Sequence, residues 1–242
     1  MNKLFLFLII FYGCGSFSKI ENFRQVSKRQ NLANDLFFLG EKYRREKNYS
    51  LSLEKYLLAN EIYRSKFDYS NEAKTLGKIG YVFSKLKNRQ GIQNTVKRLK
   101  DISGNFNKSD ELIDSIKIRE SIEFKEKIKA KALILETLNR STGIKKYYYE
   151  ALYIDAIGFD ENHIKNLILW NKNNQILYSK MNDLDNPESL LFINKILAKI
   201  GKENNDKILF TESLENCEKI INFFELVEYS DSIRELKKSW IF

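Results

Sequence analysis

The sequence predicts an all-α fold in which about ten helices stack as antiparallel hairpins. Pro occurs once and Gly ten times in 242 residues, which is too little turn-forming sequence for an all-β fold. Hydrophobic residues make up 43% and charged residues 30%, so the chain can bury a substantial core. The stretches 33–63 and 72 onward align at a constant offset of 40 residues, which is typical of repeated helical hairpins.

The chain begins with a short apolar run from Leu4 to Tyr12. As a helix, this run would span roughly 14 Å at about 1.5 Å per residue, well short of the ~30 Å hydrocarbon core of a bilayer. It therefore does not predict a membrane span. The run follows one basic residue, Lys3, and has the dimensions of the apolar region of a signal peptide.

A basic start, a short apolar run and Gly13 before Cys14 resemble a bacterial lipoprotein signal peptide. The resemblance implies cleavage after Gly13 and lipidation of Cys14, whose acyl chains would anchor the protein at about 0.8 kcal/mol per buried methylene. Phe11 and Tyr12 depart from the usual residues of the motif. An ordinary secretory signal and a buried N-terminal helix are the alternative interpretations.

The implied location is a bacterial membrane, with the outer membrane or a periplasm-facing anchor favoured over the cytoplasm. Gly15 follows the cysteine, whereas Asp at that place would favour retention in the inner membrane. The predicted domains are a lipoprotein signal peptide (1–13), a lipidated tether (14–30), helical repeats (31–160) and further repeats or a capping bundle (161–242).

The first repeated unit resembles a tetratricopeptide repeat. The places of that family's signature are filled, in order, by Leu36, Leu39, Gly40, Tyr43, Ser52, Tyr56 and Ala59, and the second unit matches with Gly80 and Phe83. The resemblance implies a helical solenoid, and it is specific for residues 33–100 and looser beyond. We expect Gly40 to allow close approach of the paired helix, and Tyr43 and Tyr56 to fill the space between the helices.

Signals for helix starts and ends continue beyond residue 100. Asp160 is expected to cap one helix, and Asn186 before a proline starts another. Gly201 is expected to end that helix at its C′ position, before a long amphipathic stretch over 206–239. We expect loops at 46–49, 68–71, 103–109, 139–143, 157–161, 182–186 and 201–205.

The tetratricopeptide resemblance also implies a concave groove lined by the first helix of each unit. The groove places fall on Asn34, Phe37, Glu41 and Arg44 in the first unit, and on Lys74, Gly77, Tyr81 and Ser84 in the second. Aromatic, amide and charged groups together suit an extended or helical peptide. The expected partner is therefore an envelope protein.

Enzyme and metal signatures are not found in the sequence, which predicts no enzyme, no cofactor and no metal site. The single histidine, His163, follows a helix start and is expected to be exposed. With Cys14 lipidated, Cys217 has no disulfide partner and is predicted to be a buried thiol. The net charge is +9, but basic residues alternate with acidic ones in several stretches, so a nucleic-acid partner is not expected.

The preferred hypothesis is a membrane-anchored, non-enzymatic scaffold or adaptor that binds another protein of the bacterial envelope. One alternative is a small-ligand-binding lipoprotein that serves an uptake system, which requires an enclosed apolar pocket. The other is an envelope enzyme that acts on glycan, which requires two converging carboxylates in a cleft.

Overall fold

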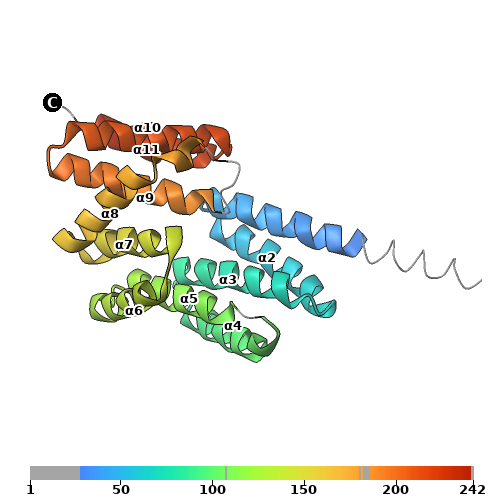
Figure 1. Cartoon of the computed structure of the whole chain (residues 1–242). Coiled ribbons are helices and arrows are strands. Elements are labelled where there is room, and N and C mark those ends of the chain that lie inside the picture. The colour runs from blue at the N-terminus through green and yellow to red at the C-terminus, as the bar shows by residue number, and fades with distance from the viewer. Residues whose placement is uncertain (1–27, 107, 180, 182–185, 241–242) are drawn as a thin grey trace, which may run out of the picture. The chain divides into compact units, whose positions relative to one another are not determined.

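A computed structural model describes residues 28–106, 108–179, 181 and 186–240, which form eleven α-helices and no strand (Figure 1). The predicted all-helical class is confirmed for these residues. Cys14, the apolar run before it and the tether up to residue 27 lie outside them. The helices are 28–45, α2 (Tyr49–Ser65), α3 (Tyr69–Lys85), α4 (Arg89–Asp101), α5 (Ser109–Glu123), α6 (Lys127–Arg140), α7 (Gly143–Ile157), α8 (Glu161–Asn173), α9 (Pro187–Glu203), α10 (Lys207–Phe223) and α11 (Ser230–Lys238).

The chain divides into two compact units between Ile116 and Lys117, within α5. The sequence placed a boundary between residues 160 and 161 instead. We call the described residues up to 116 the N-terminal unit and those from 117 onward the C-terminal unit. Short 3-10 segments supplement the helices at Ser103–Asn105, Gln175–Ser179 and Val227–Tyr229.

The first four helices of the N-terminal unit are joined by three connections of one repeated geometry. Each connection has three residues, and its central residue has a φ between 53° and 60°. The next residue caps the following helix by accepting a hydrogen bond from a backbone N–H three positions on. The central residues are Lys47, Phe67 and Lys87, and the caps are Asn48, Asp68 and Asn88. The 20-residue step between connections accounts for the 40-residue offset in the sequence.

Phe67 is the one aromatic residue at these central places, and 74% of it is exposed. A bulky side chain is strained at its φ of 56°, whereas Asn tolerates this left-handed conformation. We expect Phe67→Asn to raise the free energy of unfolding by about 0.5–1 kcal/mol, measured by urea denaturation. Lys87→Asn, at an equivalent place without the aromatic ring, is the control. A destabilised Phe67→Asn protein would contradict the strain argument.

The 28–45 helix packs closely on α2. A Cβ added at Gly40 would lie 2.5 Å from Cδ1 of Tyr56, whose ring is fully buried. Ser52 Oγ donates a hydrogen bond of 2.9 Å to the Gly40 carbonyl oxygen, across the same contact. Tyr43, by contrast, is only half-buried and Leu39 is 40% exposed, so these two packing places differ from the expected arrangement.

The C-terminal unit has its core around α9 and α10. Cys217 is a fully buried free thiol, as predicted, and burial raises its pKa to about 12. Gly201 was predicted to end a helix, and this is wrong, because α9 continues to Glu203 and the chain reverses at Asn205 (φ 54°). The core side chains include Leu190, Ile193, Ile196, Leu197, Ile200, Leu214, Ile220 and Ile221.

Two further connections were not predicted. The stretch 206–239 is interrupted after α10 by a turn at Glu225 (φ 53°), so it is not one long helix. A similar turn at Lys125 (φ 59°) separates α5 from α6. Neither turn contains glycine or proline at its centre, so neither break had a local signal in the sequence.

Candidate binding face on α3

One face of α3 combines basic and aromatic side chains. Lys74, Lys78, Tyr81 and Lys85 recur at i, i+4, i+7 and i+11, which places them along one side of the helix. Lys74 is exposed and the other three are half-buried. We call these four residues the α3 face. The core side of the helix carries Ala73, Leu76, Ile79 and Val82.

The hairpin formed by α3 and α4 carries charge of a single sign between residues 73 and 100. This stretch holds eight basic residues and no acidic one. Residues 28–116 contain 18 Lys and Arg against 11 Asp and Glu, whereas residues 117–242 contain 20 of each. The excess positive charge is therefore concentrated in the N-terminal unit. The stretches in which basic and acidic residues alternate lie outside residues 73–100, so this concentration was not predicted; a count in windows of about one hairpin finds it.

A buried carboxylate, Glu41, lies beside the α3 face. It is 8% exposed and binds Arg44 Nη2 at 2.8 Å and Lys78 Nζ at 3.1 Å. The hydroxyl of Tyr56 donates a third hydrogen bond to the same carboxylate. Glu41 thus ties the 28–45 helix to α2 and α3. We call Glu41, Arg44, Tyr56 and Lys78 the Glu41 cluster.

The cluster keeps Glu41 ionised. Burial alone would raise its pKa, but Lys78 and Arg44 and the hydrogen bond from Tyr56 outweigh burial and lower the pKa to about 2. Burial, with the neighbouring Glu41 charge, raises the pKa of Tyr56. The carboxylate therefore offsets part of the charge of Lys78, while Lys74 and Lys85 lie outside the cluster.

Two cations lie near the ring of Tyr81. The guanidinium of Arg44 and the amino group of Lys85 are each 5.7 Å from its centroid, within the range of cation–π attraction. Because Arg44 is also bound to Glu41, its guanidinium is held in place beside the ring. The arrangement offers a flat aromatic surface framed by positive charge.

The structure brings several predicted groove residues together, but in packing contacts. Asn34 accepts a hydrogen bond of 2.7 Å from the Tyr63 hydroxyl, and Phe37 lies with its ring centroid 5.7 Å from that of Tyr56. Glu41, Arg44 and Ser84 are buried. Of the predicted groove set, Lys74 and Tyr81 belong to the α3 face. Sequence reasoning missed Lys78 and Lys85.

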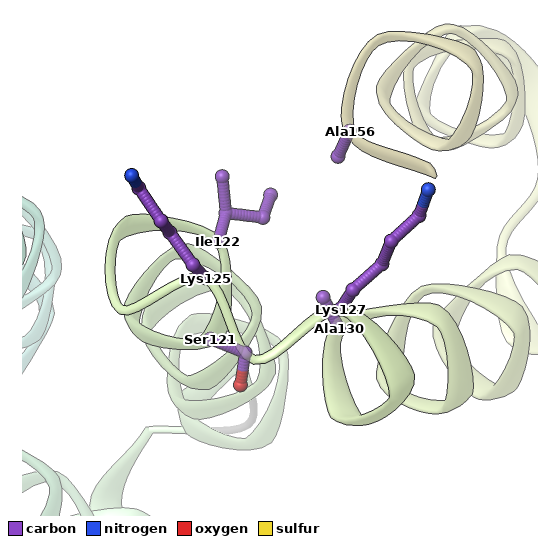
Figure 2. Close-up of a pocket in the computed structure, with 6 residues that line it drawn as sticks. All are labelled: Ser121, Ile122, Lys125, Lys127, Ala130 and Ala156. Atoms are coloured by element: carbon purple, nitrogen blue, oxygen red, sulfur yellow. The ribbon is translucent and has the colours of Figure 1, made fainter. Parts of the chain in front are cut away.

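Neither of two surface depressions is lined by residues of the α3 face. One, of about 310 Å³, is lined by residues of both charges at the ends of α2 and α4, and there Arg98 is held by the fully buried Glu72 at 2.7 Å. The other, of about 230 Å³, belongs to the C-terminal unit. Figure 2 shows Lys125 and Lys127 rising on either side of Ser121 in this second depression.

His163 differs from its expected exposure. Its Nδ1 contacts the carboxylate of Glu150, which is 1% exposed and also accepts a hydrogen bond of 3.2 Å from Asn166. The Tyr153 ring lies 4.1 Å from the imidazole, centroid to centroid. These contacts fix α8 on α7. Within the described part of the chain, no group of three or more His, Cys, Asp or Glu residues is placed to hold a metal ion.

The fold and the α3 face define an all-helical protein with a basic, partly aromatic surface on one helix. Comparison with protein-family models, with curated proteins and with solved structures found no match to this chain. Among the described helices, none combines the length and the hydropathy that a membrane crossing needs.

Proposed function

We propose that the protein is a membrane-anchored, non-enzymatic scaffold that binds another protein of the bacterial envelope. In this proposal, stacked hairpins resembling tetratricopeptide repeats form the frame, and lipidated Cys14 holds the chain at the membrane. The observation that carries the proposal is the α3 face, because it joins accessible positive charge to an aromatic ring on a rigid helix. The 310 Å³ depression is at the lower end of ligand-pocket volumes. It therefore supports the alternative of a small-ligand-binding protein less than the α3 face supports a protein partner.

The chemistry of the α3 face fits an acidic segment of the partner. Lys74 and Lys78 are about one helical turn apart, and Lys85 follows two turns later with Tyr81 between them, so the cations extend over roughly 16 Å. Acidic side chains at i and i+4 on a partner helix have the same spacing of about 5–6 Å. Tyr81 adds a contact for an apolar side chain at the centre of the face. Complementary charge of this kind favours fast and selective association.

We expect the double variant Lys74→Glu/Lys85→Glu to lose partner binding by at least about tenfold, because attraction becomes repulsion at both ends of the α3 face. The measurement is crosslinking in intact envelope membranes, followed by affinity capture and quantitative mass spectrometry. Lys97→Glu/Lys100→Glu, on the exposed side of α4, is the control with the same change of charge. Its capture should equal that of the wild type.

Two results would contradict different parts of the proposal: the role of the α3 face and the scaffold function itself. Equal capture by the α3 variant and the wild type would show that binding does not use the α3 face. Recovery of no crosslinked protein from the wild type would contradict the scaffold function itself. A Cys14→Ser variant, which is expected to leave the membrane fraction, tests the anchor separately.

A further inference from the structure

The 28–45 helix carries an apolar stripe that α2 covers only in part, since Leu36 packs against the cluster that includes Ala59 and Tyr63 of α2. Leu32, Leu36, Leu39 and Tyr43 recur at i, i+4, i+7 and i+11 and lie on one side of the helix. Leu32 is 50% and Leu39 is 40% exposed, and the other two are half-buried. We call these four residues the Leu39 stripe. Exposed leucines along one helix face are typical of an interaction surface.

The equivalent residues of the second hairpin, formed by α3 and α4, are buried by helix packing. At the 40-residue offset, Leu36 and Leu39 correspond to Leu76 and Ile79, which are 5% and 1% exposed. The same side of α3 meets α4, since Glu72 on α3 binds Arg98 on α4 at 2.7 Å. In the second hairpin this side is therefore a helix-packing face.

Two leucines of α2 are exposed as well. Leu51 and Leu58 are 37% and 42% exposed, and they correspond at the same offset to Gly91 and Arg98, which contact α3. Both helices of the first hairpin thus present apolar side chains where the second hairpin packs helix against helix. A further helix laid on this side would bury them.

The charges beside the Leu39 stripe indicate which helix fits. Lys28, Asp35, Lys42 and Glu46 border the stripe along one edge, and their signs alternate. If two copies of the helix pair in antiparallel fashion, Lys28 faces Glu46 of the second copy. Asp35 then lies within reach of Lys42 of the second copy. The midpoint between the two residues of each pair lies within two residues of position 38. One antiparallel alignment of the two helices therefore brings both pairs together.

We propose that the Leu39 stripe binds a second copy of this chain, with the two 28–45 helices antiparallel about a two-fold axis. Two-fold symmetry repeats each ion pair, so four complementary pairs flank one apolar seam. Leu36 of each copy meets Leu39 of the other. The α3 face plays no part in this contact, so the two binding events are independent.

Sedimentation equilibrium of the full chain, in a density-matched detergent, tests the pairing. We expect the wild type to be a dimer. Asp35→Lys and Lys42→Asp should each weaken dimerisation by about tenfold or more, because each places like charges opposite one another twice. The combined Asp35→Lys/Lys42→Asp variant restores opposite charges, so its dissociation constant should return to within about threefold of the wild type.

Glu61→Lys, an exposed change of charge on α2 outside the stripe, is the control and should leave the dimer unchanged. Helix content by circular dichroism shows whether each variant is folded. A monomeric wild type would overturn the proposal. That result is expected if residues 15–27 or a different protein cover the stripe. A dimer that the combined variant fails to rescue would overturn it too.

Discussion

Replacing Glu41 by Gln is expected to lower the free energy of unfolding of the N-terminal unit by about 3 kcal/mol. Glu41 is buried and binds Arg44 and Lys78, so the neutral amide removes the negative charge that Glu41 places beside the 9% exposed Arg44. Removal of one partner from a buried ion pair is costly because the remaining charge has no solvent to replace it. Denaturant titration, with hydrogen exchange to locate the loss in residues 28–116, measures the effect.

The Glu41→Gln variant should also differ from the wild type in how its free energy of unfolding depends on pH in acid. The folded-state pKa of Glu41 is about 2, below its ordinary value of 4.5. Its contribution to stability is therefore fully present above about pH 4.5 and is lost as the pH falls through about 2. We expect the wild type to lose about 3 kcal/mol more than Glu41→Gln across this interval.

Glu54→Gln provides the matched control for both measurements. Glu54 pairs with its neighbour Lys55 on the exposed side of α2, and exposed pairs of this kind contribute little to stability. We expect no measurable change in that variant. A Glu41→Gln protein as stable as the wild type, with the same acid profile, would show that the Glu41 cluster does not hold the first three helices together.

Features with local causes were predictable from the sequence. The 40-residue offset predicted repeated helical hairpins in residues 33–100, and the described helices there follow a 20-residue step. Asp160 and Asn186 cap helices as predicted, because a cap needs only its own side chain and the next few backbone N–H groups. The buried thiol of Cys217 followed from apolar neighbours at helical spacing.

The site could be predicted only in part, because it depends on how each helix is rotated about its axis. A small rotation decides whether Glu41 and Arg44 line a groove or face α2 and α3, and packing of Gly40 on Tyr56 fixes that rotation. No pattern within one helix contains this information. The charge of the α3 face, by contrast, was present in the sequence and needed only a shorter window.

Gly201→Ala is expected to lower the free energy of unfolding of the C-terminal unit by about 2 kcal/mol. Two effects oppose each other at this position. Alanine favours a helix interior by up to about 1 kcal/mol relative to glycine. However, its Cβ would lie 2.6 Å from the backbone nitrogen of Phe210 and 3.0 Å from its Cα, so α10 must move as a whole. We expect this clash to outweigh the gain in helix propensity.

Whether Gly201→Ala lowers or raises the free energy of unfolding distinguishes two roles for Gly201: a close contact inside α9, or the end of the helix. Gly201 lies within α9, so its role is to let α10 approach, and a Cβ is harmful because of its volume. Gly104→Ala is the control, since a Cβ there meets nothing within 4 Å, and it should be neutral or slightly stabilising. Thermal denaturation with hydrogen exchange in α9 and α10 measures both variants. A Gly201→Ala protein of unchanged or increased stability would mean that α9 and α10 pack less closely than the structure shows.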